Sequence, residues 1–256
     1  MKKLFFAVLL ITTITSCKDK DKDQPENPTY GDIKIKFEHF WGHSHSGHEA
    51  EAFQLNTNLV TETAGDTVSF SKLKYYISNV QFTDVSGTVV AESESYHLVD
   101  FSSKNPFELI IEDIPTGEYV AVNFTIGVDS VRNVSGAQEG ALSPSNEMFW
   151  SWNTGYRFIV AEGQCVTSTG NQDFTYHLGG FSGSNNAINV VDFAFGESLT
   201  TNPTATPSLH FNVNVQSFWN SNFNLKDNKM IHMPGTKAVN AANNFAGGFE
   251  LNHVHK

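Results

Sequence analysis

Apolar and polar side chains alternate along most of the chain. Ile33, Ile35 and Phe37 alternate with two lysines and a glutamate, which is the period-two pattern of a strand with one buried face. Further runs with strand character are residues 73–77, 96–101, 107–114, 120–126, 156–161, 173–178, 188–195 and 209–218.

Two features interrupt this alternation. After residues 73–77 the pattern shifts by one position at Ser78 and Asn79, which indicates a β-bulge. Pro115, followed two positions later by Gly117, predicts a turn that leads into the next strand.

Helical periodicity is scarce. Clusters of Gly, Asn, Ser and Thr separate the strand runs, and one short helix is predicted after Lys237, where residues 238–244 are rich in Ala and Asn. The pattern therefore predicts an all-β fold, namely an antiparallel β-sandwich or a partly open barrel, with long loops and at most short helices. It does not define the order of the strands.

The first residues form an apolar segment of a different kind. Lys2 and Lys3 precede an apolar run over residues 4–14, which is shorter than the roughly 20 residues that span a bilayer. Two small residues then precede Cys17, as expected for a signal peptide over residues 1–16 that is cleaved before a lipid-bearing cysteine. The alternative is an ordinary secretory signal in which Cys17 has no special role.

The segment after Cys17 is polar. It reads CKDKDKDQPENPTYG and has no apolar side chain before Tyr30, so residues 17–30 are predicted to be a flexible, lipidated tether. Residues 31–256 then form the β domain. The Lys-Asp pattern resembles the surface-export signal of Bacteroidetes lipoproteins. We therefore expect an outer-membrane lipoprotein, anchored to the membrane through Cys17, that faces the periplasm or the cell surface.

The charge of the chain limits its partners. Sixteen Lys and Arg oppose 27 Asp and Glu, and removal of residues 1–16 changes the formal charge from −11 to −13. A chain this acidic, without a basic cluster, is not expected to bind nucleic acid or anionic lipid electrostatically. With Cys17 lipidated, only Cys165 remains, so no intramolecular disulfide can form.

Ten histidines are the most unusual chemical feature of the sequence. Four fall within residues 39–48, including the pair His43 and His45, and the chain ends with the pair His253 and His255. An H-x-H spacing on an extended backbone places both imidazoles on one side, and several imidazoles together suit Cu or Zn. The alternative is that a Gly/Ser/His loop and a frayed tail are simply solvated.

Other candidate ligands are more isolated. His97, His177 and His210 lie singly within strand patterns and are interpreted as core or rim residues. Met230 and Met233 flank His232, and thioethers favour Cu(I), although methionine is also an ordinary core residue.

The aromatic run MFWSWNTGYRF at residues 148–158 is the most distinctive motif. One explanation is an aromatic core plug with alternating inward rings, which needs no function. The run also resembles the signature of the MbnP family, periplasmic or surface proteins often encoded beside di-haem peroxidases of the MauG type. Segments GDIKIKFEHF, LKYYISNVQF, IPTGEYVAVNFTIGVD, FTYHLGG and FELNHVH resemble other parts of that family, in the same order.

The resemblance implies a copper-binding role. Characterised relatives bind copper through histidines, and the positions that match best are His39, His177, His253 and His255. The histidines at 43, 45 and 48 lie in what resembles a local insertion, so only their spacing supports them. The expected copper ligands are drawn from this set: His39, His43, His45, His253 and His255.

The resemblance also bears on tryptophan, because in some relatives the partner peroxidase oxidises a tryptophan to kynurenine. The candidates are Trp41, two residues before His43, and Trp150 and Trp152 in the signature block. The alternative is that all three are ordinary packing residues.

Two hypotheses follow. The first is a non-enzymatic envelope lipoprotein that binds copper for acquisition, storage or sensing, with a di-haem peroxidase as its partner. The second is a surface β-sandwich module that binds glycan or protein through exposed aromatics such as Trp41 and Trp219. No nucleophile motif, phosphate loop or acid/base pair in the sequence indicates an enzyme.

Overall fold

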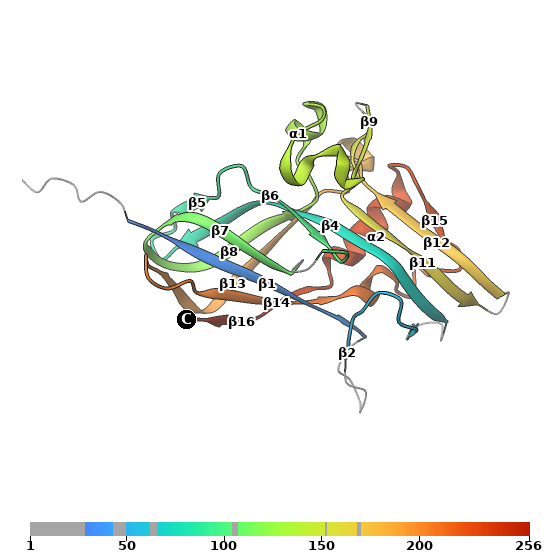
Figure 1. The fold of residues 1–256 in the computed structure, drawn as a ribbon, viewed down its shortest axis with the longest axis horizontal. Coiled ribbons are helices and arrows are strands. Elements are labelled where there is room, and N and C mark those ends of the chain that lie inside the picture. The colour runs from blue at the N-terminus through green and yellow to red at the C-terminus, as the bar shows by residue number, and fades with distance from the viewer. Residues whose placement is uncertain (1–28, 43–49, 62–65, 104–106, 152, 168–169) are drawn as a thin grey trace, which may run out of the picture.

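The structure is a computed structural model that describes residues 29–42, 50–61, 66–103, 107–151, 153–167 and 170–256 (Figure 1). The predicted signal peptide, Cys17 and all but the last two residues of the tether lie outside the described residues. His43, His45, His48 and Trp152 lie outside them as well.

The described residues form two packed sheets, and the smaller one contains both the opening strand and the last strand. Its order is β16-β14-β1, and both β2 and β7 pair with β1. The strand bounds are β1 (Tyr30–Trp41), β2 (Glu51–Ala52), β7 (Glu108–Pro115), β14 (Ser208–Asn214) and β16 (Phe249–His255).

The larger sheet has the order β13-β8-β4-β11-β12-β15, and the short strands β3, β5 and β6 pair with β4. Its strands are β3 (Leu59–Val60), β4 (Thr67–Asp84), β5 (Val89–Ala91), β6 (Tyr96–Asp100), β8 (Gly117–Ile126), β11 (Ile159–Thr167), β12 (Gly170–Leu178), β13 (Asn189–Thr201) and β15 (Met230–Ile231). A separate small pair, β9 (Phe149–Ser151) and β10 (Gly155–Tyr156), stands above this sheet together with α1 (Figure 1).

Helices are few and short among the described residues. The α-helices are α1 (Ser130–Val134) and α2 (Thr236–Ala246), and the 3-10 turns are η1 (Gly140–Leu142), η2 (Pro144–Asn146), η3 (Gly183–Asn185) and η4 (Val215–Phe218). The position of α2 confirms the helix predicted after Lys237. None of the helices in the described ranges is long and apolar enough to cross a membrane.

Aromatic rings fill the space between the two sheets. The ring of Phe37 on β1 lies 5.6 Å from that of Phe211 on β14, and it meets the rings of Tyr75 and Phe124 on the larger sheet edge-on at 6.4 and 6.0 Å. Phe245 on α2 stacks on Phe218 at 4.6 Å and closes one side of this core. Edge-on and tilted ring pairs of this kind add directional attraction to the hydrophobic effect.

The β-sandwich-like architecture confirms the predicted fold class, and the sheets do not close into a barrel. The bulge predicted at Ser78 and Asn79 is also confirmed, because the register of β4 against β8 shifts there and Asn79 has a φ of 52°. One part of the prediction was wrong, since the sandwich is not purely antiparallel: β1 runs parallel to β14, and β12 runs parallel to β15. Parallel neighbours need long crossover connections, and the alternation within a strand does not reveal them.

Candidate functional site

The C-terminal histidine pair meets a third histidine on the outer face of the smaller sheet. On β14, Leu209 and Phe211 are buried, so His210 between them points outward. Its partner on β16 is His253, and the imidazole centroids are 4.3 Å apart in a stacked arrangement; the ring of His255 lies 6.4 Å from that of His210. We call His210, His253 and His255 the outer histidine patch.

His210 is the half-buried member of the patch. Its Nδ1 lies 3.4 Å from Glu38 Oε1 on β1 but has no hydrogen-bond partner, and its Nε2 lies 3.1 Å from Ser208 Oγ. Burial, and next the proximity of His253, lower the pKa of His210, although Glu38 opposes the shift. A lowered pKa keeps the imidazole neutral, which is the form that binds a metal ion.

His253 and His255 are both exposed, so their side chains are free to rotate around the patch. Among the described residues no three His, Cys, Asp or Glu side chains already converge as a metal-binding group. The patch therefore brings three imidazoles to one surface, but a shared metal ion requires side-chain rotation of the two exposed members.

His39, which the family resemblance selected as a ligand, does not join this patch. It occupies the inward-facing series of β1 with Ile35 and Phe37, and only 8 % of it is exposed. His39 and the C-terminal pair are thus on opposite faces of one sheet, because the patch histidines point outward, and β14 also lies between β1 and β16. The expectation that these segments combine into one site does not agree with the structure on this point.

The surroundings of His39 are mainly aromatic. Its Nε2 shares a 2.8 Å hydrogen bond with the hydroxyl of Tyr75, and the rings of Phe101 and Phe107 lie 4.7 and 5.0 Å away. Nδ1 has no hydrogen-bond partner among the described residues. Burial lowers the pKa of His39 from its ordinary value of 6.5 to about 3, and the backbone near Phe37 opposes this shift only in part.

This lowered pKa predicts acid sensitivity. Below pH 6.5 the unfolded chain takes up a proton at His39 that the folded chain does not, so stability falls as the pH drops. Between pH 7.5 and 5.0 this residue alone is expected to remove about 2 kcal/mol from the free energy of unfolding. Denaturant unfolding at both pH values, in the protein and in His39→Gln, measures the difference.

Glutamine accepts a hydrogen bond from Tyr75 but does not titrate, so His39→Gln should unfold more easily at pH 7.5 and yet lose less stability at pH 5.0. An identical loss in both proteins would show that His39 does not carry the acid sensitivity.

Trp41 and Trp219, which were predicted to be exposed binding residues, are buried. Trp41 is 4 % exposed and donates its indole N–H to the Val60 carbonyl at 2.8 Å. Trp219 is 6 % exposed and donates its indole N–H to the hydroxyl oxygen of Tyr176 at 2.7 Å. Their rings lie 5.9 Å apart. The predicted aromatic platform of Trp41 and Trp219 was therefore wrong, because both rings pack inside the sandwich.

Trp150 has a more accessible position. It is half-buried on β9, the guanidinium of Arg157 lies 5.7 Å from its ring, and its ring lies close over Gly179, where a Cβ atom would come within 2.7 Å. Gly179 follows the sequence His177-Leu178, so the aromatic signature block and the His-Leu-Gly segment meet in space. This contact could not be predicted from the sequence, because the two segments are far apart along the chain.

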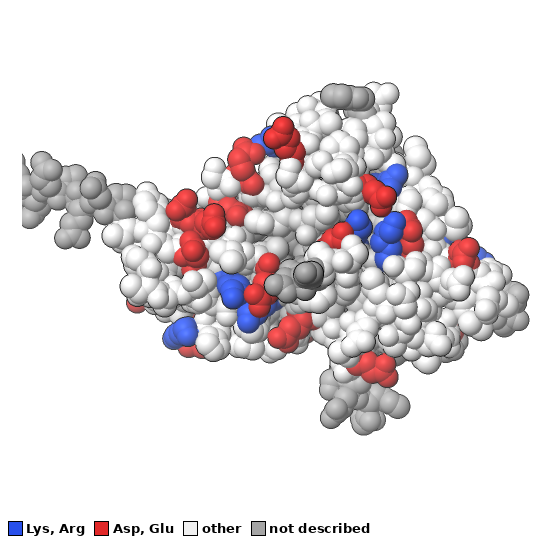
Figure 2. All heavy atoms as spheres, in the orientation of Figure 1, with Lys and Arg blue, Asp and Glu red and all other residues white. Residues whose placement is uncertain are grey.

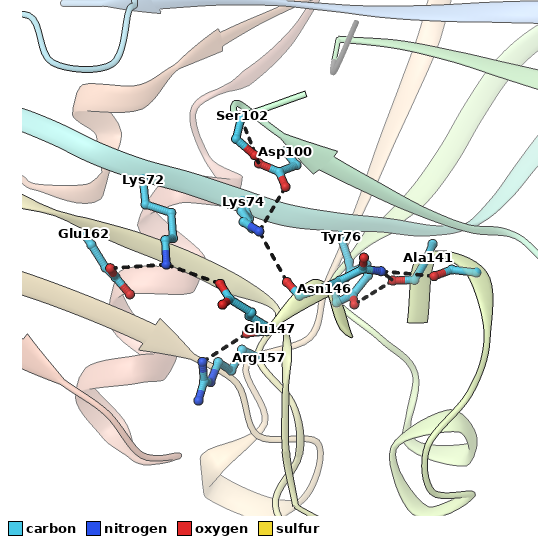
Figure 3. Close-up of polar contacts among 11 residues, drawn as sticks. Lys72, Lys74, Tyr76, Asp100, Ser102, Ala141, Asn146, Glu147, Arg157 and Glu162 are labelled. Carbon is cyan, nitrogen blue, oxygen red and sulfur yellow. Dashed lines mark hydrogen bonds and ion pairs between the residues drawn. The ribbon is translucent and has the colours of Figure 1, made fainter. Parts of the chain in front are cut away.

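Lysines of β4 hold the segment before the signature block against the larger sheet (Figure 3). Lys74 bonds to Asp100 at 3.0 Å and to the Asn146 carbonyl at 3.3 Å. Lys72 lies between Glu147 and Glu162, at 3.6 and 3.5 Å. Contacts of two lysines with Asn146 and Glu147 thus attach the chain to the larger sheet a few residues before Trp150.

Basic residues are paired with acidic ones elsewhere too. Figure 2 shows Lys and Arg in small groups beside Asp or Glu, without a continuous basic surface on this face. Lys34 and Lys36, for example, both contact Glu108 at 3.4 Å. This distribution gives no electrostatic surface for a polyanion on the face shown.

The protein is β-sandwich-like, and its aromatic signature block contacts the His-Leu-Gly segment. The chain belongs to the MbnP family, whose model matches residues 30–234. That match ends before α2 and β16 and so does not include His253 or His255. Among solved structures the chain is similar to MbnP from Methylosinus trichosporium, with 14 % identity, a TM-score of 0.45, and coverage of 73 % of this chain and 76 % of that one. The comparison with curated proteins gave no match.

His210 is the residue that the sequence reasoning missed. Its outward position follows from the alternation of Leu209, Phe211 and Val213, but its contact with His253 depends on the order of the strands.

Proposed function

We propose that this protein is a non-enzymatic envelope lipoprotein that binds copper through histidines, for acquisition, storage or sensing. The observation that carries the proposal is the outer histidine patch in a chain of the MbnP family. Imidazole nitrogens suit copper, and copper binds such donors more tightly than zinc does. His253 and His255, with His210, are the proposed ligands; His43 and His45 remain a second proposed pair.

A metal titration tests the proposal. The outer histidine patch is expected to bind about one copper ion, in competition with a chelator, more tightly than zinc, as the Irving–Williams order requires. Equal or tighter zinc binding would contradict a copper role. Absence of binding for either metal would favour the second hypothesis, a surface module that binds glycan or protein. Such a module would have to use side chains other than Trp41 and Trp219, because both are buried.

The membrane anchor is part of the same proposal, with residues 1–16 as signal peptide, 17–30 as tether and 31–256 as the β domain. Cys17→Ala is expected to leave the protein soluble in the envelope or unprocessed, because stable anchoring requires more than one acyl chain on that thiol. Fractionation followed by detergent extraction measures this. Equal membrane partition of the variant and the wild type would remove the anchor from the proposal, whichever face of the outer membrane it occupies.

We further propose a di-haem peroxidase as partner and a tryptophan as its target. Of the candidates Trp41, Trp150 and Trp152, the structure describes two, and Trp150 is the more accessible. Conversion to kynurenine gains one oxygen and loses one carbon, so it adds about 4 Da. Peptide mapping of protein from the native host, in cells that express the peroxidase, is expected to find this increment at one of the three. Unmodified peptides at all three would end the idea.

A further inference from the structure

A second group of metal-binding side chains lies at the far edge of the larger sheet. β12 and β15 run parallel there, with Thr175 opposite Met230 and Tyr176 opposite Ile231. His232, the next residue after β15, therefore comes beside His177. Their imidazole centroids are 5.3 Å apart and the rings are nearly perpendicular, at 83°.

The backbone places a thioether on the same side as these imidazoles. Tyr176 and Ile231 are buried, at 0 % and 4 % exposure, so the residues that flank them face outward. Met230 and His232 are two positions apart on an extended backbone and thus share the outer face with His177. All three side chains belong to one small surface, which we call the sheet-edge cluster.

The methionines of this segment, Met230 and Met233, are exposed, whereas Met148 is fully buried in the core. Met230 and Met233 are 55 % and 61 % exposed. Methionine usually fills gaps in a core. At this turn two thioethers flank an exposed imidazole instead, where they contribute little to packing and are available to a ligand.

His177 is already oriented for ligation. Its Nε2 lies 2.8 Å from Glu162 Oε1, and Glu162 is in turn held by Lys72 at 3.5 Å (Figure 3). A carboxylate on one ring nitrogen fixes the imidazole and directs the other nitrogen to a metal ion. The contact with Glu162 uses Nε2 of His177, so Nδ1 is the nitrogen that we expect to act as the donor.

The charges around His177 balance. Lys72 and Arg157 are positive, Glu147 and Glu162 are negative, and the four lie together in Figure 3. Imidazole and thioether donors beside carboxylates that are already paired suit a soft monovalent ion better than a hard divalent one.

We propose that His177, His232 and Met230 form a binding site for a soft monovalent metal ion, Cu(I), separate from the outer histidine patch. Glu162 is a positioning residue that holds the His177 ring. The site needs neither His253 nor His255, so it stands whether or not copper binds to the patch.

Methionine-methyl NMR of the full chain tests the site, with Ag(I) as a redox-stable probe for Cu(I). One equivalent of Ag(I) is expected to shift the Met230 methyl resonance and leave that of Met148 in place. The double variant His177→Gln/His232→Gln should lose the shift. Glu162→Gln should weaken Cu(I) binding about 10- to 100-fold in a chelator competition, the usual effect of removing a partner of a metal ligand.

Two matched variants serve as controls. Met233→Leu should keep the Met230 shift, because the proposal uses only Met230, and His253→Ala/His255→Ala should keep it because the patch is a different site. An unmoved Met230 resonance would overturn the proposal. So would a shift of equal size in the His177→Gln/His232→Gln variant, because the thioether would then bind silver without the imidazoles.

Discussion

Replacement of Phe70 by alanine is expected to lower the free energy of unfolding by about 3–5 kcal/mol, the usual range for truncation of a buried phenylalanine. Phe70 on β4 is fully buried, and its ring meets five other aromatic rings at 5.0–6.5 Å: those of Trp41, Phe53, Phe174, Phe218 and Trp219. These neighbours come from different parts of the chain, so the cavity left by the ring cannot collapse easily. Denaturant unfolding measures the loss.

Phe195 provides the matched control. It is only half-buried, on the edge strand β13, so Phe195→Ala leaves a site that solvent can fill. Its loss should be clearly smaller than that of Phe70→Ala. Similar losses for the two variants would mean that the ring cluster around Phe70 is not the centre of stability that the structure indicates.

The second large effect concerns copper. The double variant His253→Ala/His255→Ala is expected to weaken copper binding by more than about 100-fold, because even partners of metal ligands contribute about 10- to 100-fold. Both side chains are exposed on the last strand, so the variant should unfold like the wild type. Chelator competition gives the affinity, and circular dichroism confirms the fold.

The quadruple variant, with His43→Ala and His45→Ala added, separates the two proposed pairs. If only the quadruple variant loses copper, the N-terminal pair holds the ion; if the double variant already does, the patch holds it. Unchanged affinity in the quadruple variant would show that neither pair is the site.

Much of the fold could be predicted because side-chain alternation is local. The inner series Ile33, Ile35 and Phe37 identified β1 and its buried face. The same series includes His39, so its burial was readable from parity, although the family resemblance had suggested a ligand. Alternation also revealed the bulge near Asn79.

The candidate site could be predicted only in part, because it depends on contacts between distant segments. The H-x-H spacing of His253 and His255 was visible, but the position of β14 between β1 and β16 was not. The position of β14 separates His39 from the C-terminal pair and places His210 beside His253. The burial of Trp41 and Trp219 likewise depends on how the sheets pack, which aromatic content alone does not specify.

The parallel pairing of β1 with β14 has a consequence for the time course of folding. Lys34 is opposite Ser208, so this contact joins residues from opposite ends of the domain. A pairing of such range closes a very long loop before it gains any contact energy, which places folding in the slow, millisecond-to-second range of β proteins. Until the last fifth of the chain is present, the opening strand has no neighbour on that side, so the smaller sheet is completed only after nearly all of the chain has been made.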